Sequence, residues 1–374
     1  MVAKGLALLA VLALLSPTAF ARPFTGDFNG DGSVGLDDLS YFLKQFSACK
    51  AGGAWDVSTD LVPGNGLNHL DATAMVEGYL LHGPVPGRFI VFYSDRPGGQ
   101  GDYDIYLYDR SAGSLVALPG LNSAAMDADP SLTPDGRYIV FSSLRTGTSQ
   151  ICLYDRASSA LVPLPNLASA VDQYSPCITP DGQLIAFSTQ TDHVDFDDVV
   201  LYDRGSNSLV SLPGLNTDYE SDDWPSLTAD GRYIVFSSYR PASGGSVTFV
   251  YDRNTTSMVS LPRPAAPATG DNWPTGVSLD GRYVASYDTV PGDGSDVFLY
   301  DRNASAFVTL SGLNSTAEDT FPALSSDGRY LAFQSTRSDA SGFSHVYLYD
   351  RNTSSFVDCP GLNSTYRDAA PRLN

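Results

Sequence analysis

The strongest constraint on the fold is an internal repeat. The triplet YDR occurs six times, beginning at Tyr108, Tyr154, Tyr202, Tyr251, Tyr300 and Tyr349. A DGRY motif or a close variant of it precedes each triplet, and both motifs recur every 46 to 50 residues. A period of this length, in a chain of short apolar runs and Gly/Pro turns, indicates stacked units that cannot bury their apolar faces alone.

One repeat predicts four short strands. PSLT (130–133) is a strand, and PDGR forms a tight turn in which Gly136 can adopt a positive φ. YIVFSS (138–143) is an apolar strand expected to be buried on both faces, QICLY (150–154) is the third strand, and LVPLP (161–165) is the fourth. Four antiparallel strands repeated radially predict an all-β fold whose repeats are the blades of a propeller.

The ends of the repeat region predict how the ring closes. The first repeat opens at Gly87 without the preceding P-x-L-x strand, whereas the chain finishes with RDAAPRLN, which has that pattern. The C-terminal strand is therefore expected to complete the first blade, so that no sheet edge stays open at the closure. Residues 85–374 are predicted to form a six-bladed β-propeller.

The motif P-x-L-T-P-D-G-R-x-I-x-F-S-S-x-R followed by Y-L-Y-D resembles the TolB-like (WD40-like) β-propeller repeat. The resemblance covers roughly residues 87–374. It implies the fold more than a function, because TolB-like propellers include periplasmic binding proteins, peptidase gating domains and some lyases.

The N-terminus has the pattern of a secretory signal peptide. Lys4 precedes an apolar run from Gly5 to Leu15 that is too short to span a bilayer, and Ala19-Phe20-Ala21 matches a cleavage site. We expect residues 1–21 to be removed and the mature protein to be secreted or periplasmic. No second segment predicts membrane insertion, and the protein is expected to be a monomer.

Charge and cysteine content narrow the partners. The formal net charge is −20, so the basic footprint that a nucleic acid requires is missing, whereas excess carboxylate suits a protein that meets divalent cations. The four cysteines (Cys49, Cys152, Cys177, Cys359) do not fix a disulfide pairing. A bridge between Cys152 and Cys177, in neighbouring repeats, remains one alternative, and Cys359 is expected to pack as a small hydrophobe.

Two acidic loops precede the propeller. DFNGDGSVGLDD (27–38) presents oxygen ligands at the spacing of an EF-hand loop, and the apolar residues after it follow helical spacing. The predicted calcium ligands of this loop are Asp27, Asn29, Asp31, Ser33 and Asp38. A second, longer loop repeats the pattern less closely, with Asp56, Ser58, Asp60, Asn68 and Asp71. Calcium is thus the predicted cofactor.

The two loop-helix units of residues 22–84 resemble a dockerin-type EF-hand pair. The resemblance implies a cohesin-like protein partner, contacted by residues that match the family's positions: Leu36, Asp37, His69 and Leu70. Such pairs also occur as calcium-stiffened spacers, and the sequence leaves both roles open.

A column of carboxylates suggests one site in the propeller. Three residues before the inner-strand proline, five repeats carry Asp127, Asp222, Asp271, Asp319 or Asp368, and the third repeat has Gln173. These residues would ring one mouth of the channel and bind a cation or a basic peptide. The favoured alternative is a cross-strand ion pair within a blade. Asp127, Asp222, Asp319 and Asp368 would then pair with Arg145, Arg240, Arg337 and Arg96, respectively, and Asp271 has no such arginine.

Aromatic residues near the same proline suggest a stacking surface. Trp224, Trp273 and Phe321 each directly precede it and could stack on sugar or peptide, or pack between blades. With Asp271, they are the predicted binding residues of the propeller. Loops between the second and third strands vary in every repeat, and one carries an acidic set (Asp192, Asp195, Asp197, Asp198) interpreted as solvated.

Catalytic motifs are missing from the sequence. There is no G-x-S-x-G nucleophile elbow, and the four histidines lack metal-ligand spacing. The sequence therefore favours a non-catalytic binding protein that recognises a protein or a glycan. The alternative is a propeller-type glycosidase, lyase or peptidase-related protein with an acid pair hidden among the repeated carboxylates.

Overall fold

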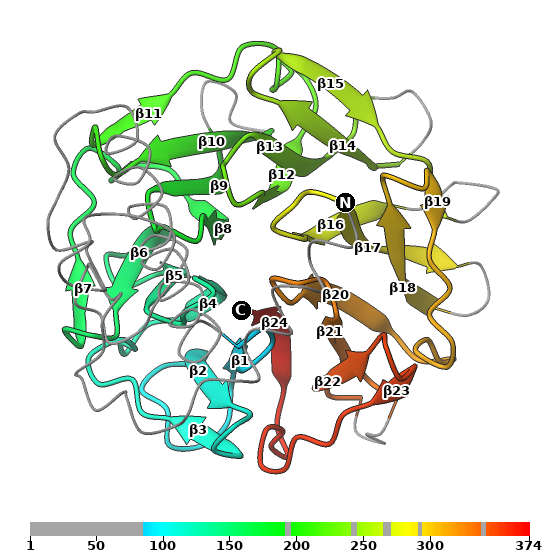
Figure 1. The fold of residues 1–374 in the computed structure, drawn as a ribbon. Helices are drawn as coiled ribbons and strands as arrows, with labels where there is room; N and C mark the ends of the chain where they lie inside the picture. The colour runs from blue at the N-terminus through cyan, green and yellow to red at the C-terminus, as the bar shows by residue number, and fades with distance from the viewer. Residues whose placement is uncertain (1–84, 191–195, 241–244, 265–270, 291–293, 338–341) are drawn as a thin grey trace, which may run out of the picture. The chain divides into compact units, whose positions relative to one another are not determined.

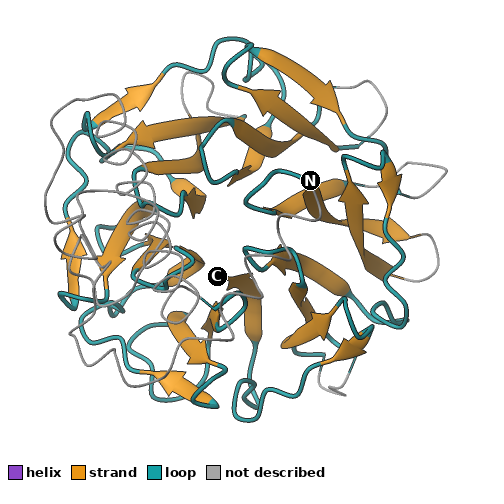
Figure 2. Ribbon diagram, in the orientation of Figure 1, coloured by secondary structure: helices purple, strands orange, loops and turns teal. Residues whose placement is uncertain are grey.

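The computed structural model describes residues 85–374, apart from 191–195, 241–244, 265–270, 291–293 and 338–341. The described residues form twenty-four strands in six four-stranded sheets and contain no helix (Figure 2). Accordingly, none of the described segments is a helix long and apolar enough to cross a membrane. The predicted all-β class and the six blades are confirmed.

Each sheet is one blade, and the six blades surround a common axis (Figure 1). From the inner to the outer strand, the first three blades are β24 (Asp368–Leu373), β1 (Phe89–Ser94), β2 (Asp104–Asp109) and β3 (Ser114–Val116); β4 (Asp127–Leu132), β5 (Tyr138–Ser143), β6 (Gln150–Asp155) and β7 (Ala160–Val162); and β8 (Gln173–Ile178), β9 (Leu184–Gln190), β10 (Asp197–Asp203) and β11 (Ser208–Val210). The next three are β12 (Asp222–Leu227), β13 (Tyr233–Ser238), β14 (Val247–Asp252) and β15 (Ser257–Ser260); β16 (Asn272–Val277), β17 (Tyr283–Val290), β18 (Gly294–Asp301) and β19 (Ala306–Phe307); and β20 (Asp319–Leu324), β21 (Tyr330–Ser335), β22 (His345–Asp350) and β23 (Ser355–Phe356).

The C-terminal strand closes the ring, as the sequence predicted. Strand β24 pairs antiparallel with β1, and Figure 1 shows the red C-terminal strand beside the blue first strand. The backbone nitrogen of Gly87 donates to the backbone oxygen of Asn374 over 2.9 Å. The two ends of the repeat region therefore form one blade.

The strand limits differ from the prediction at both edges of a blade. The predicted fourth strand 161–165 is shorter, Ala160–Val162, because Pro163 and Pro165 have no N–H to donate to a ladder. The predicted inner strand 130–133 is longer and begins at Asp127. It continues past Pro130 because a bulge between Ala128 and Ser131 takes the proline out of the ladder.

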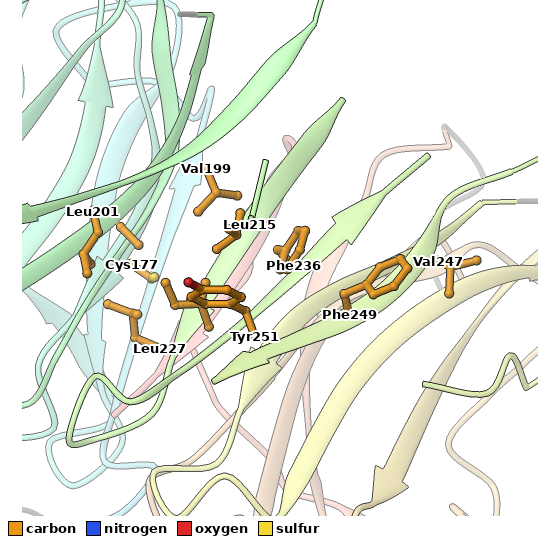
Figure 3. Close-up of a cluster of buried hydrophobic side chains, with 11 residues drawn as sticks. Cys177, Val199, Leu201, Leu215, Leu227, Phe236, Val247, Phe249 and Tyr251 are labelled. Carbon is orange, nitrogen blue, oxygen red and sulfur yellow. The ribbon is translucent and has the colours of Figure 1, made fainter. Parts of the chain in front are cut away.

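The hydrophobic core lies between neighbouring blades. Figure 3 shows one cluster in which Cys177, Val199 and Leu201 of the third blade pack against side chains of the fourth blade, including Phe236 and Tyr251. Since each cluster is shared by two blades, burial of apolar area couples the blades to one another.

The cysteines of the propeller are free thiols. Cys177 lies in the cluster between the third and fourth blades, whereas Cys152 packs in the cluster between the first and second. The possible bridge between them is therefore absent. Cys359 packs as a partly buried hydrophobe, as predicted.

The YDR triplet links each blade to its neighbour. In the second blade, the Tyr154 hydroxyl donates to the Pro119 carbonyl of the preceding blade over 2.9 Å. The Arg156 guanidinium donates to the Gly136 carbonyl over 2.6 Å and lies 4.9 Å from the ring centroid of Phe89. Equivalent arginine–carbonyl bonds occur in all six blades, with Arg110, Arg204, Arg253, Arg302 and Arg351.

The aspartate of the triplet binds the arginine of the DGR turn. Asp109, Asp155, Asp252, Asp301 and Asp350 form these pairs with Arg88, Arg137, Arg232, Arg282 and Arg329. The turn itself requires glycine, since Gly136 has a φ of 71° and a Cβ there would lie 2.6 Å from the ring of Phe89. Both repeated motifs are therefore parts of the scaffold.

Candidate functional site

The ring of carboxylates is mostly a set of buried ion pairs. Asp127 pairs with Arg145 at 2.9 Å, Asp222 with Arg240 at 2.5 Å and Asp319 with Arg337 at 2.6 Å. Asp368 pairs with Arg96 in the same way. All four aspartate side chains have no exposed surface. The predicted cross-strand pairs are confirmed, and these carboxylates are already neutralised by arginine rather than available to a ligand.

The third blade replaces the pair with an amide. The Gln173 side chain is 3% exposed, accepts from the Ile151 nitrogen over 3.2 Å and donates to the Leu167 carbonyl over 2.9 Å. In the second blade, Arg145 donates to the matching carbonyl, that of Leu121. A neutral side chain thus binds the same backbone carbonyl without a counter-charge.

In the fifth blade, the strand register shows that Asp271 does not occupy the repeated carboxylate position. Asn272 pairs with Asp288 as Asp127 pairs with Ser143, so Asn272 occupies the repeated position and Asp271 lies one residue earlier. The inner strand of this blade contains one extra residue before its DGR turn, which spacing from the proline alone did not reveal. Asp271 accepts from the Ser246 nitrogen over 2.9 Å and hydrogen-bonds with Tyr239. It is therefore not a member of the ion-pair column.

A bulge at the inner-strand proline turns side chains toward the axis. In five blades the residue before this proline has a positive φ between 45° and 55°: Asp129, Ser175, Trp224, Phe321 and Ala370. This conformation is strained for bulky residues, and its repetition shows that the ring geometry imposes it. The rings of Trp224 and Phe321, from the fourth and sixth blades, approach to a centroid distance of 5.3 Å.

Two further rings extend this contact into an aromatic cluster. Tyr287 lies 5.1 Å from Phe321, and Trp273 stacks on Tyr287 at 5.0 Å. Tyr287 is 7% exposed, whereas the other three side chains are half-buried. The three predicted aromatic residues therefore belong to one cluster, in which Tyr287, a ring that the sequence did not single out, connects Phe321 to Trp273.

Asp223 is the carboxylate beside these rings that has no counter-charge. Its side chain is 8% exposed, and Oδ1 has no hydrogen-bond partner among the described residues. Burial, together with the charges of Asp197 and Asp222, raises the pKa of Asp223 to about 7, and a hydrogen bond from Ser237 opposes the shift only in part. A buried carboxyl with an unused acceptor oxygen is costly unless a ligand supplies the missing partner.

Tyrosines surround the carboxylates of this region. Tyr174 hydrogen-bonds with Asp197. The pKa of the Tyr174 phenol is raised, mainly by burial and secondly by this hydrogen bond. Burial and the charge of Asp271 raise the pKa of Tyr239 to about 12. These phenols stay protonated at neutral pH and leave the negative charge of the region uncompensated.

We call this set the mouth cluster, because its members lie where the inner strands begin and the blades connect. It consists of Tyr174, Asp197, Asp223, Trp224, Tyr239, Asp271, Trp273, Tyr287 and Phe321. Among the described residues, no three His, Cys, Asp or Glu side chains are arranged to hold a metal ion. The cluster therefore combines dispersed negative charge with aromatic faces, a combination that suits an organic cation.

The structure places the predicted binding residues together but not the calcium ligands. Asp271, Trp224, Trp273 and Phe321 all belong to the mouth cluster. The ten predicted calcium ligands, from Asp27 to Asp71, lie outside the described residues. Sequence reasoning missed Asp223, although a signal existed: the matching residue is Ala128 in the second blade and Ala369 in the first.

Comparison with known proteins supports the fold. Neither a protein-family model nor a curated protein sequence matches the chain. The crystal structure of TolB from Acinetobacter baumannii superposes with a TM-score of 0.61 at 17% identity, covering 83% of this chain and 73% of that one. A protein of Agrobacterium tumefaciens assigned as TolB gives 0.53 at 17% identity, covering 73% and 88%. A chain of the nidogen/laminin complex gives 0.51 at 9% identity, covering 76% and 98%. The propeller is thus TolB-like in fold.

Proposed function

We propose that this protein is a secreted, non-catalytic binding protein whose propeller recognises a protein partner through the mouth cluster. A positively charged side chain of the partner would enter beside Asp223 and lie against the aromatic rings. The observation that carries the proposal is the unpartnered Oδ1 of Asp223, a residue that is 8% exposed and lies near the carboxylates of Asp197 and Asp271. A guanidinium or ammonium group supplies both the missing donor and the missing charge.

Two other features support a cationic ligand. Trp224, Trp273 and Phe321 are half-buried, so part of each ring is open to a ligand, and aromatic faces attract cations. The propeller segments outside the described structure contain no lysine or arginine in the sequence (191–195, 241–244, 265–270, 291–293 and 338–341). A glycan would also stack on these rings, but it would leave the charge of the three carboxylates uncompensated.

Peptide binding tests this proposal. Short neutral-flanked peptides with one central Arg, Lys or Glu are titrated into the full chain by calorimetry at pH 8. We expect the Arg and Lys peptides to bind and the Glu peptide not to bind. Asp223→Asn should weaken binding of the Arg peptide at least tenfold, whereas Asp218→Asn, at an exposed carboxylate in the connection before β12, should leave the affinity unchanged. Equal binding of all three peptides would overturn the proposal.

The raised pKa of Asp223 also supports a second function. A carboxyl group that titrates at about 7, close to the carboxylate of Asp197, has the character of a general acid paired with a base. A glycosidase built on this pair would hydrolyse polysaccharides and lose turnover in Asp223→Asn. If an activity screen detects turnover and Asp223→Asn abolishes it, the protein is an enzyme, and the proposed non-catalytic role is wrong.

For the N-terminal residues we propose calcium binding by the dockerin-like pair, which docks to a cohesin-like protein or stiffens the N-terminus. The support is the spacing of the oxygen ligands in residues 27–38. Calorimetry of the full chain with Ca²⁺ should show one tight site that Asp27→Ala removes. If Asp27→Ala binds calcium as the parent does, the loop assignment is wrong.

A further inference from the structure

A second unusual charge lies on the propeller axis, toward the DGR turns. Arg372 on β24 pairs with Val91, and the residues at the same register position of the other blades are small and uncharged: Ser131, Cys177, Ser226, Gly276 and Ala323. Arg372 is therefore the one charged member of this ring. Its position breaks the repeat as Asp223 does, but with the opposite sign.

Arg372 lines a cavity that all six inner strands enclose. The cavity has a volume of about 80 Å³ and is also lined by the hydroxyl-bearing residues Ser131, Ser226 and Thr275. No aspartate or glutamate lines it. The space is sufficient for a small oxyanion with accompanying water.

The guanidinium has few partners inside the protein. Its Nη1 donates to the Pro371 carbonyl over 3.1 Å, and no described carboxylate lies within ion-pair distance of it. The charge of Asp129, at a greater distance, raises the pKa of Arg372, but burial has the larger effect and lowers it. Most of its five N–H donors therefore have no partner among the described residues and are available to an anion.

We propose that this axial cavity is an anion-binding site, in which Arg372 binds a small oxyanion, a carboxylate or a phosphate group, with the hydroxyls of Ser131 and Ser226 around it. Planar guanidinium donors suit the paired oxygens of such a group. The site differs from the mouth cluster in its residues and in the charge of the ligand that it takes. It adds an anionic ligand to the cationic one proposed above.

The test compares oxyanions with chloride at constant ionic strength and pH 7. Thermal unfolding of the full chain is followed with potassium acetate, potassium phosphate and potassium chloride. Saturating oxyanion should raise Tm by about 2–4 °C over chloride. Stabilisation by acetate alone identifies a carboxylate ligand, and stabilisation by phosphate as well identifies a general oxyanion site. No difference between the three salts would overturn the proposal.

Substitutions separate a binding role from a structural one. Arg372→Met should remove the oxyanion effect and leave Tm in chloride unchanged, because no described carboxylate forms an ion pair with this guanidinium. Arg367→Met, an exposed arginine in the connection before β24, is the matched control and should keep the effect. If Arg372→Met lowers Tm in chloride and keeps the oxyanion effect, Arg372 serves the fold and the proposal is wrong.

Discussion

Two sets of carboxylates in this propeller behave in opposite ways. Five of the six aspartates of the YDR triplets meet the arginine of a DGR turn, and the side-chain bond to Arg232 holds the pKa of Asp252 at about 2. In the mouth cluster, burial and neighbouring carboxylates raise the pKa of Asp223 to about 7. The repeated carboxylates are satisfied by the fold, whereas the unrepeated one is not. In a repeat protein, the residues that break the repeat therefore identify the candidate site.

The largest effect is expected where a repeated pair is broken. Asp222→Ala leaves the Arg240 guanidinium without the partner it meets at 2.5 Å, in a place where the aspartate has no exposed surface. We expect a loss of about 3–5 kcal/mol in the free energy of unfolding, measured by urea denaturation. The double variant Asp222→Leu/Arg240→Met, which removes both charges, should recover most of this loss. A single variant as stable as the parent would contradict the scaffold role of the pair.

Substitution of the unrepeated carboxylate, Asp223, should raise the free energy of unfolding rather than lower it. Since the pKa of Asp223 is raised from 3.8 to about 7 in the folded protein, the fold binds that proton more tightly than the unfolded chain does. Stability therefore falls as pH rises from about 4 to about 7 and is level above. Asp223→Asn should exceed the parent by about 2–4 kcal/mol at pH 8 and match it below pH 4.

The same linkage applies to the proposed ligand. A cation binds the ionised form of Asp223, so its affinity should fall about tenfold for each pH unit below 7. Calorimetry of the Arg peptide at pH 8, 7, 6 and 5 measures this slope. An affinity that does not change over this range would separate the ligand from Asp223.

The arginines of the YDR triplet offer a comparison within the scaffold. Arg156 both binds the Gly136 carbonyl and lies over the ring of Phe89, whereas Arg253 binds the Gly231 carbonyl, beside which Leu184 takes the place of the ring. Each alanine substitution should cost about 1–3 kcal/mol, and Arg156→Ala about 0.5–1 kcal/mol more. Chemical denaturation of both variants checks the difference. Equal losses would show that the aromatic contact adds nothing.

The smallest effect is expected for the exposed charge pairs of the triplets. Arg232 has 38% of its side chain exposed, and water screens its pairing with Asp252. Arg232→Gln should leave the midpoint of urea unfolding at pH 7 within experimental error of the parent. The lowered pKa of Asp252 implies that any contribution is present above pH 4 and is lost as pH falls toward about 2. A large loss at pH 7 would contradict the distinction between buried and exposed pairs.

The sequence predicted the parts of the molecule that obey the repeat. Six blades, closure by the C-terminal strand and the four Asp–Arg pairs follow from residues that recur at fixed spacing, because each recurrence marks one structural position. The alignment failed at Asp271, where the fifth inner strand contains an extra residue that only the strand register reveals. Asp223 was missed because its burial and its unpaired oxygen depend on side chains from neighbouring blades. A comparison within one repeat cannot supply that information.

The most direct test of the account is the ionisation of Asp223 itself. Carbon-detected NMR of the aspartate carboxyl groups, with Asp223→Asn to assign the resonance, gives its pKa without and with a saturating Arg peptide. We expect a value of about 7 in the free protein, because the group is buried among like charges, and a fall of two units or more when the peptide is bound. A free-protein value near 4, unchanged by the peptide, would show that Asp223 is already compensated and is not a ligand site.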